Sequence, residues 1–115
     1  MSYASGRQVP TTSVTHLPSE LPGTLLDVRE DEEWQAGHAP GAVHVPLTEL
    51  STRLDELDLD RTVHVICRSG ARSAQAVAWL NENGADAVNV AGGMNAWARN
   101  GRPMQADGDA EPFVR

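Results

Sequence analysis

The chain has 115 residues, 40% of them apolar, which is enough to bury the core of one ordinary domain. Its formal net charge is −7 and its 9 basic residues are all arginines, which argues against nucleic acid or an anionic membrane surface as a partner and excludes chemistry that needs a lysine. Cys67 is the only cysteine, so no disulfide can form within the chain, and the longest apolar run, residues 76–80, is too short to cross a membrane.

Short runs rich in β-branched residues alternate with helical stretches along the middle of the chain. The run at 24–28 is apolar on both faces, as in a buried parallel strand, and Gly84 stands where a left-handed residue can end a helix. In chain order we predict a strand at 13–16, a strand at 24–28, a helix at 31–36, a strand at 43–45, a helix at 47–57, a strand at 62–66, a helix at 73–83, a strand at 87–90 and a helix at 94–99. This order predicts an α/β fold with a small, mostly parallel sheet of about five strands and helices on both faces.

The two ends of the chain differ in composition from its middle. Residues 1–12 are rich in Ser, Gly and Thr, and residues 105–115 carry Asp, Gly, Pro and Glu with few apolar anchors. We therefore predict one domain over 13–104, a flexible N-terminal lead-in over 1–12 and a flexible acidic C-terminal tail over 105–115. Residues 1–10 also lack the apolar core of a secretion signal, so we expect a cytoplasmic protein.

The most reactive side chain stands directly after the predicted strand at 62–66. Cys67 is followed by a short loop with two arginines and then by a predicted helix. Ligands of open α/β sheets bind at the carboxyl ends of strands, and a helix N-terminus offers free N–H groups and partial positive charge. A loop this short can turn successive amides toward one centre, which favours a thiolate. We predict a thiolate at Cys67 in an anion-binding loop formed by Arg68, Ser69, Gly70, Ala71, Arg72 and Ser73.

A simpler interpretation exists for Cys67 and for the other candidate residues. A free cysteine taken alone is usually an inert buried side chain, and only its combination with the loop favours a charged sulfur. One cysteine and scattered histidines do not have the spacing of a zinc site, so we expect no metal, and we expect no cofactor. The acidic run 30–33 is interpreted as helix N-terminal charge on a solvated face, or as a docking patch for a basic partner. Asp27 and Arg29 are expected to pair and to brace the neighbouring loop.

Three motifs occur in order between residues 14 and 104. They are Leu26-Asp27-Val28-Arg29 with Glu33-Trp34 and Gly37-His38-Ala39-Pro40-Gly41-Ala42, then Cys67-Arg68-Ser69-Gly70-Ala71-Arg72, then Gly92-Gly93-Met94-Asn95-Ala96-Trp97 with Gly101 and Pro103. Together they resemble the signature of the rhodanese family of sulfurtransferases in its single-domain form. The resemblance implies that Cys67 takes a sulfane sulfur from a small anionic donor such as thiosulfate and becomes a persulfide. It implies that a thiophilic acceptor, cyanide in vitro or a thiol in the cell, then removes the sulfur.

The same resemblance assigns roles within the loop. The amides of residues 68–73 would cradle the anionic sulfur, and Arg68 and Arg72 would orient the donor. Phosphatases of a similar fold place five residues between cysteine and arginine, whereas four separate Cys67 from Arg72 here, which favours sulfur transfer. The loop departs from that of the thiosulfate enzyme, with Ser69 in place of a lysine and Arg72 in place of a small hydroxyl residue.

Three alternatives to a thiosulfate-type enzyme stay open at this point. The first is a sulfur-relay carrier that delivers persulfide sulfur to a partner protein. The second is a non-catalytic binding module with the same fold, against which the presence of Cys67 and both arginines argues. The third is a phosphatase or an enzyme similar to arsenate reductases, which the four-residue spacing disfavours.

Overall fold

A five-stranded parallel sheet forms the centre of the protein in a computed structural model that describes residues 8–115. The strands lie in the order β1-β5-β4-β2-β3, and every neighbouring pair is parallel. Their bounds are β1 Thr11–Ser13, β2 Thr24–Asp27, β3 Val43–His44, β4 Val63–Ile66 and β5 Ala87–Ala91. The predicted α/β class and the parallel sheet of five strands are confirmed.

Helices cover both faces of this sheet. They are α1 Asp31–Ala36, α2 Ala71–Glu82 and α3 Gly93–Arg99. Successive strand residues point to opposite faces, so β4 sends Val65 into one apolar cluster and Ile66 into the other. The first cluster includes Val77 of α2, and the second includes Met94 of α3. Hence α2 and α3 pack on opposite faces.

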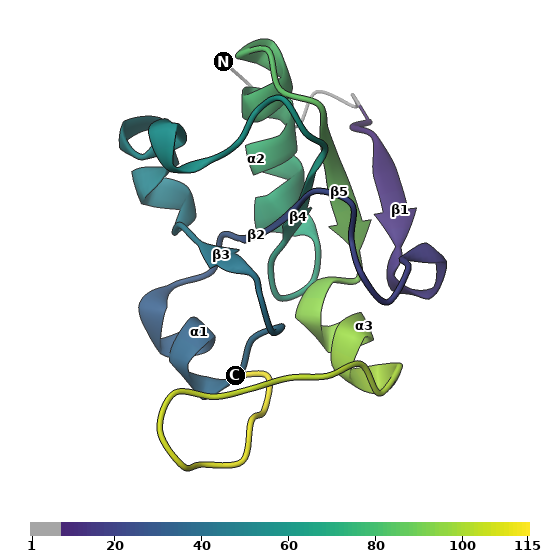
Figure 1. Cartoon of the computed structure of the whole chain (residues 1–115), viewed down its shortest axis with the longest axis vertical. Coiled ribbons are helices and arrows are strands. Elements are labelled where there is room, and N and C mark those ends of the chain that lie inside the picture. The colour runs from purple at the N-terminus through teal and green to yellow at the C-terminus, as the bar shows by residue number, and fades with distance from the viewer. Residues whose placement is uncertain (1–7) are drawn as a thin grey trace.

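The carboxyl ends of the strands meet at one edge of the sheet. In Figure 1 this is the lower edge, where α1, the loop that follows β4 and the beginning of α3 come together. β4 lies at the centre of the sheet between β5 and β2. The residue that follows β4 is therefore surrounded by protein on several sides.

The first strand differs from the prediction. A strand was expected at 13–16, but β1 ends at Ser13 and a 3₁₀ turn, η1 Val14–His16, follows. β1 pairs with β5 from Thr11 to Ser13, and β5 ends at the partner of Ser13, so the chain has no further strand to bond. The expectation for 14–16 is therefore wrong. β1 also begins inside the segment 1–12 expected as a lead-in, of which residues 1–7 lie outside the described residues.

The helix predicted at 47–57 is replaced by two short 3₁₀ helices, η2 Leu47–Thr52 and η3 Leu54–Glu56. Arg53 stands between them with φ −121° and ψ 20°, outside the α-helical region. Its guanidinium bonds Glu49 at 3.0 Å and Glu56 at 2.7 Å, which ties both pieces to this break. Short pieces let the chain follow the core, because Leu50 and Leu57 are both buried in the first cluster. The prediction of one helix is wrong.

The C-terminal residues 105–115 lie against α1. His38 and Gln105 exchange two backbone hydrogen bonds, each 2.9 Å long, and the Phe113 amide donates to the Ala36 carbonyl at 3.0 Å. A Cβ on Gly37 would overlap the carbonyl of Phe113, so the segment passes very close to the end of α1. The flexibility expected of these residues stays a prediction. No helix within residues 8–115 is long and apolar enough to cross a bilayer.

Candidate active site

Cys67 follows β4 at the carboxyl edge of the sheet and is only 1% exposed. The first turn of α3 holds the chain around it, because the Met94 amide donates to the Cys67 carbonyl at 2.8 Å and the Asn95 amide to the Arg68 carbonyl at 3.0 Å. Gly93 lies directly beneath these two carbonyls, and a Cβ there would overlap the Cys67 oxygen. Gly93 also has φ +55°, a left-handed conformation that glycine adopts without strain.

Several polar groups surround the sulfur, and two of them lie within hydrogen-bond distance of it. The Gly70 amide donates to Sγ at 3.1 Å, and the Ser73 hydroxyl oxygen lies 3.2 Å from Sγ. Gly70 has φ +114°, which lets the loop turn its amide inward. Burial raises the pKa of the Cys67 thiol. Hydrogen bonds outweigh this effect and hold the pKa below its ordinary value; they come from the Ser73 hydroxyl and from the amides of Ser73, Gly70 and Ser69.

The helix after the loop begins earlier than predicted. α2 starts at Ala71, although a start at residue 73 was expected, so Arg72 and Ser73 lie in its first turn. Gly70 precedes it as the left-handed residue at its N-terminus. The sulfur therefore lies beside free amides and partial positive charge, both of which favour an anion. The end of α2 agrees with the prediction, because Gly84 has φ +90° just beyond it.

The two arginines of the loop have different surroundings. Arg72 forms a bidentate ion pair with Glu33 of α1, with Nη1–Oε1 2.7 Å and Nη2–Oε2 2.9 Å. The hydrogen bond from Arg72 holds the pKa of Glu33 below its ordinary value. Arg68 is exposed, and its side chain makes no hydrogen bond or ion pair with residues 8–115. Sequence reasoning assigned Glu33 to a solvated acidic face, so this contact was missed.

Asn89 of β5 extends the contacts behind the sulfur. The Ser73 hydroxyl donates to Asn89 Oδ1 at 2.5 Å, and Asn89 Nδ2 lies 3.4 Å from the Gly70 carbonyl. Ser73 is completely buried and Asn89 is 7% exposed. Sequence reasoning did not select Asn89. The sequence feature that could have indicated Asn89 is its place in a strand otherwise built of Ala and Val, because a buried polar side chain needs a hydrogen-bond partner.

Asp27 and Arg29 form a buried ion pair at the end of β2. Arg29 Nη2 lies 2.7 Å from Asp27 Oδ2, and neither side chain is exposed to solvent. The same Nη2 donates to the carbonyl of Gly37 at 2.8 Å, which ties the end of α1 to the sheet. The pairing expected from the sequence is confirmed. It braces α1, the helix that carries Glu33, rather than contacting the sulfur.

The histidines of the first motif anchor a turn. His38 Nδ1 lies 2.7 Å from the Trp34 carbonyl and His44 Nε2 lies 2.7 Å from the Arg29 carbonyl, and both rings stack on Trp34. The interpretation of His38 as a turn anchor is confirmed. His64 of β4 is half-buried, and burial lowers its pKa. Within residues 8–115 no three His, Cys, Asp or Glu side chains come together as metal ligands would.

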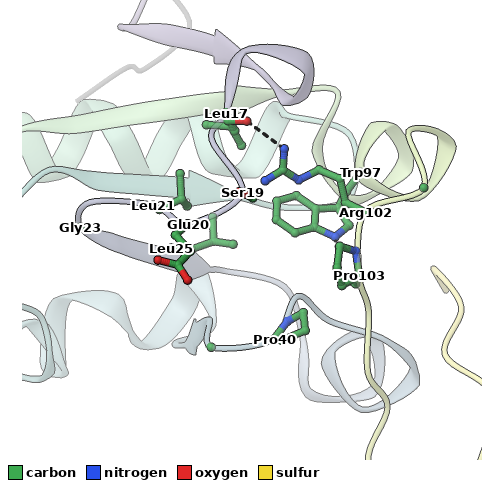
Figure 2. A pocket seen from close by; sticks show the side chains of 12 residues that line it. Leu17, Ser19, Glu20, Leu21, Gly23, Leu25, Pro40, Trp97, Arg102 and Pro103 are labelled. Atoms are coloured by element: carbon green, nitrogen blue, oxygen red, sulfur yellow. Dashed lines mark hydrogen bonds between the residues drawn. The ribbon is translucent and has the colours of Figure 1, made fainter.

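A separate pocket of about 800 Å³ opens on the face of the sheet that α3 covers. Figure 2 shows Trp97 and Arg102 on one side of it and Leu21, Leu25 and Pro40 on the others. Arg102 lies 4.6 Å from the centre of the Trp97 ring. Neither Cys67 nor its loop lines this pocket, so the two sites are distinct.

A five-stranded parallel sheet, with a single cysteine directly after its central strand and a short loop that leads into a helix, matches the rhodanese-like fold. The family model described as "Rhodanese-like domain" matches residues 13–100, so the chain belongs to this family. The chain carries one rhodanese-like domain and is homologous to sulfurtransferases, so the family resemblance of the three motifs is confirmed.

Curated relatives carry names from the same field. The chain is 44% identical over 79 residues to a Bacillus subtilis protein named "Putative sulfurtransferase YtwF", covering 69% of this chain and 77% of the relative. It is 43% identical over 83 residues to a protein of Allochromatium vinosum named "Sulfurtransferase", covering 71% and 78%. It is 42% identical over 74 residues to the Bacillus subtilis "Putative sulfur carrier protein YrkF", covering 64% of this chain and 40% of that protein.

Solved structures show the same fold. A rhodanese-related protein from Thermoplasma volcanium superposes with a TM-score of 0.80 at 32% identity, over 85% of this chain and 99% of that one. A rhodanese-like domain protein from Staphylococcus aureus gives a TM-score of 0.65 at 34% identity, over 84% of each chain.

Proposed function

We propose that the protein transfers sulfane sulfur from a small anionic donor to a thiophilic acceptor through a persulfide on Cys67. The observation that carries this proposal is the environment of the Cys67 sulfur. The sulfur accepts a hydrogen bond from the Gly70 amide at 3.1 Å, lies next to the Ser73 hydroxyl, and its pKa is held below the ordinary value. A thiolate is the form that attacks sulfur, so these contacts prepare the reaction. Family membership and the sulfurtransferase names of two relatives support the same chemistry.

The reaction proceeds in two displacements. The Cys67 thiolate attacks the outer sulfur of the donor, a new S–S bond forms, and the electron pair of the donor's old bond leaves with the rest of the donor, which is sulfite when the donor is thiosulfate. An acceptor, cyanide in the assay or a thiol in the cell, then attacks the outer sulfur of the persulfide. The Sγ–S bond breaks and its electron pair returns to Cys67 as thiolate.

The arginines contribute unequally to donor binding in this proposal. Arg68 is exposed and unpaired within residues 8–115, so it is the guanidinium able to meet an incoming anion. Arg72 is already bonded to both oxygens of Glu33, which neutralises its charge. Arg72 then acts mainly by holding α1 against the first turn of α2.

A second candidate function is sulfur relay to a partner protein. It is favoured by the neutralised Arg72, because a loop with one available guanidinium attracts a dianion such as thiosulfate less than a loop with two. The similarity to a relative named as a sulfur carrier supports it as well. The chemistry at Cys67 is the same in both candidates, and only the acceptor and the preferred donor differ.

The direct test is to incubate the purified chain with thiosulfate or with a small-molecule persulfide and to record its intact mass. We expect the mass to rise by one sulfur atom and to return to its original value when cyanide is added, with thiocyanate formed. Cys67→Ser is expected to take up no sulfur, because the hydroxyl that replaces the thiol is not ionised near neutral pH.

Ser69→Ala is the matched control, since it removes a loop hydroxyl and keeps the amide that faces the sulfur. It should form the adduct normally. An unmodified wild-type mass with every donor contradicts both the enzyme and the relay proposals. Adduct formation without turnover to cyanide, but with transfer to a protein thiol, favours the relay.

A further inference from the structure

The sulfur of Cys67 stands at one end of a buried chain of three polar side chains. Ser73 Oγ lies 3.2 Å from the sulfur and donates to Asn89 Oδ1 at 2.5 Å. The Asn89 amide nitrogen lies 3.4 Å from the Gly70 carbonyl. All three side chains are at most 7% exposed, so water competes little for these bonds.

The direction of each bond follows from which groups can donate. A backbone carbonyl only accepts, so the NH₂ of Asn89 must face Gly70 and its oxygen must face Ser73. That oxygen also only accepts, so it takes the single hydroxyl proton of Ser73. The hydroxyl then turns a lone pair to the sulfur, an arrangement that suits a protonated thiol, which can donate to it.

An ionised sulfur changes this arrangement, because a thiolate can only accept. Thiolate and Asn89 oxygen then compete for the one proton of Ser73, and the charged acceptor forms the stronger bond. When the hydroxyl turns to the sulfur, the Asn89 oxygen is left buried without that donor, which is unfavourable. The hydrogen bond from the Ser73 hydroxyl to the sulfur lowers the pKa of Cys67. This bond can form only when the hydroxyl gives up its hydrogen bond to Asn89.

We propose that Asn89 is a positioning residue that holds the Ser73 hydroxyl proton away from the Cys67 sulfur in the resting protein and releases it while the sulfur carries charge. Asn89 thereby sets the fraction of thiolate present before a donor arrives. Once the persulfide has formed, the charge moves to its outer sulfur and the hydroxyl can return to Asn89. The inference rests on the proposed function only in taking Cys67 as the nucleophile.

Variants of Asn89 and Ser73, which test this proposal, leave the other charged groups near the sulfur unchanged. Arg68 and Arg72 lie on its own loop and helix, and Glu33 faces Arg72 from α1. The neighbouring strand β2 ends in the Asp27–Arg29 pair. Neither β5 nor α3 brings a titratable side chain to the sulfur among the contacts that shift its pKa. A change seen in an Asn89 variant therefore comes from the hydroxyl proton or from the contact between Asn89 and Gly70, and the Ser73→Ala background separates these two causes.

The experiment is an ultraviolet titration of the thiolate, for which the single cysteine is an advantage, since Cys67→Ser gives the background to subtract. Removing the competing acceptor in Asn89→Leu is expected to lower the Cys67 pKa by about one pH unit, a tenfold increase in thiolate at a pH below it. Ser73→Ala is expected to raise the pKa. In the Ser73→Ala background, Asn89→Leu is expected to cause no further shift, because there is no hydroxyl left to redirect.

Asn81→Leu is the matched control: its amide bonds the backbone of Ala87 at the beginning of β5, so it tests loss of an asparagine without reaching the sulfur. It should leave the Cys67 pKa unchanged. Asn89→Val serves as a second variant if Asn89→Leu folds poorly. A pKa that rises or stays constant in folded Asn89 variants, or a shift that persists without Ser73, overturns the inference. The titration contains no donor, so its outcome is independent of whether sulfur transfer is observed.

Discussion

The residue whose contact most alters the chemistry of the loop is Glu33. Its carboxylate receives both terminal nitrogens of Arg72 and so removes one of the two positive charges expected near the donor. The bond to Arg72 lowers the pKa of Glu33, so stability from this pair is present above the ordinary carboxyl pKa and is lost as pH falls through the lowered value. If Arg72 lies near the donor, as the proposed function requires, Glu33 couples donor binding to the placement of α1.

Glu33→Gln is expected to free Arg72 for the donor. Glutamine can keep the contact with the Glu30 amide that begins α1, so the helix should form normally. We expect the KM for thiosulfate to fall about fivefold, because one additional hydrogen bond contributes a net free energy of roughly 1 kcal/mol. Steady-state kinetics of thiocyanate formation measure it.

Glu32→Gln is the control for this change, since it removes the same charge from an exposed position of the same helix. Equal effects of the two substitutions would mean that overall charge, rather than release of Arg72, governs donor affinity. An increased KM in Glu33→Gln would show that the ion pair orients the donor as it stands.

At the scale of elements, the first turn of α3 packs against the loop and donates hydrogen bonds to the carbonyls of Cys67 and Arg68. Gly93→Ala is expected to push the Cys67 and Arg68 carbonyls out of place, because a Cβ there would overlap both. We expect the rate of persulfide formation to fall at least tenfold and the midpoint of thermal unfolding to decrease. Stopped reactions analysed by intact mass give the rate, and calorimetry gives the midpoint.

Gly101→Ala separates the two possible causes of such a loss, which are backbone strain at a positive φ and steric overlap with the loop. Gly101 also has a positive φ, +67°, but no atom outside its chain neighbours lies within 4 Å of a Cβ built there. It should lower stability by about 1 kcal/mol from backbone strain and leave persulfide formation unchanged. Equal losses of activity in both variants would show that the loop does not depend on the fit beneath it.

The elements that sequence reasoning located correctly are those with strong local patterns. β4 and α2 combine a buried apolar run with a following helix, and Cys67 lies between them, so the candidate nucleophile could be found from the sequence. The helix expected at 47–57 is interrupted at Arg53, whose φ of −121° lies outside the α-helical region, and the two short pieces bring both Leu50 and Leu57 into the core. Nothing in the hydrophobic pattern of the sequence indicates that break. The end of β1 is set by the end of β5, its pairing partner, so the local sequence around Ser13 does not determine it.

The missed parts of the site have a common physical cause. Glu33 and Arg72 are 39 residues apart, and Ser73 and Asn89 are 16 apart, so neither contact belongs to a local pattern. Each contact forms because the parallel sheet brings α1, the loop and β5 to the same edge. The position of Cys67 between β4 and α2 could be predicted, but the long-range contacts of Ser73 with Asn89 and of Arg72 with Glu33 could not.

At the scale of the whole molecule, the C-terminal segment tests how far the domain extends. The backbone of 105–115 bonds to His38, Gln35 and Ala36, all at or next to the end of α1. Deleting residues 105–115 is expected to lower the free energy of unfolding by about 2 kcal/mol, because several backbone hydrogen bonds of roughly 0.5–1.5 kcal/mol each are lost and the entropy of ordering the segment is regained. Urea denaturation followed by tryptophan fluorescence measures the change.

Phe113→Ala supplies the comparison for the deletion. The Phe113 side chain is 57% exposed while its amide bonds Ala36, so the substitution removes the ring and keeps the backbone contact. It should change stability by well under half of the effect of the deletion. A deletion that leaves the denaturation curve unmoved would mean that the segment is as flexible as its composition suggests and that the folded domain ends near Met104. A loss of stability would extend the domain to include the segment that crosses the end of α1, beside the helix that carries Glu33.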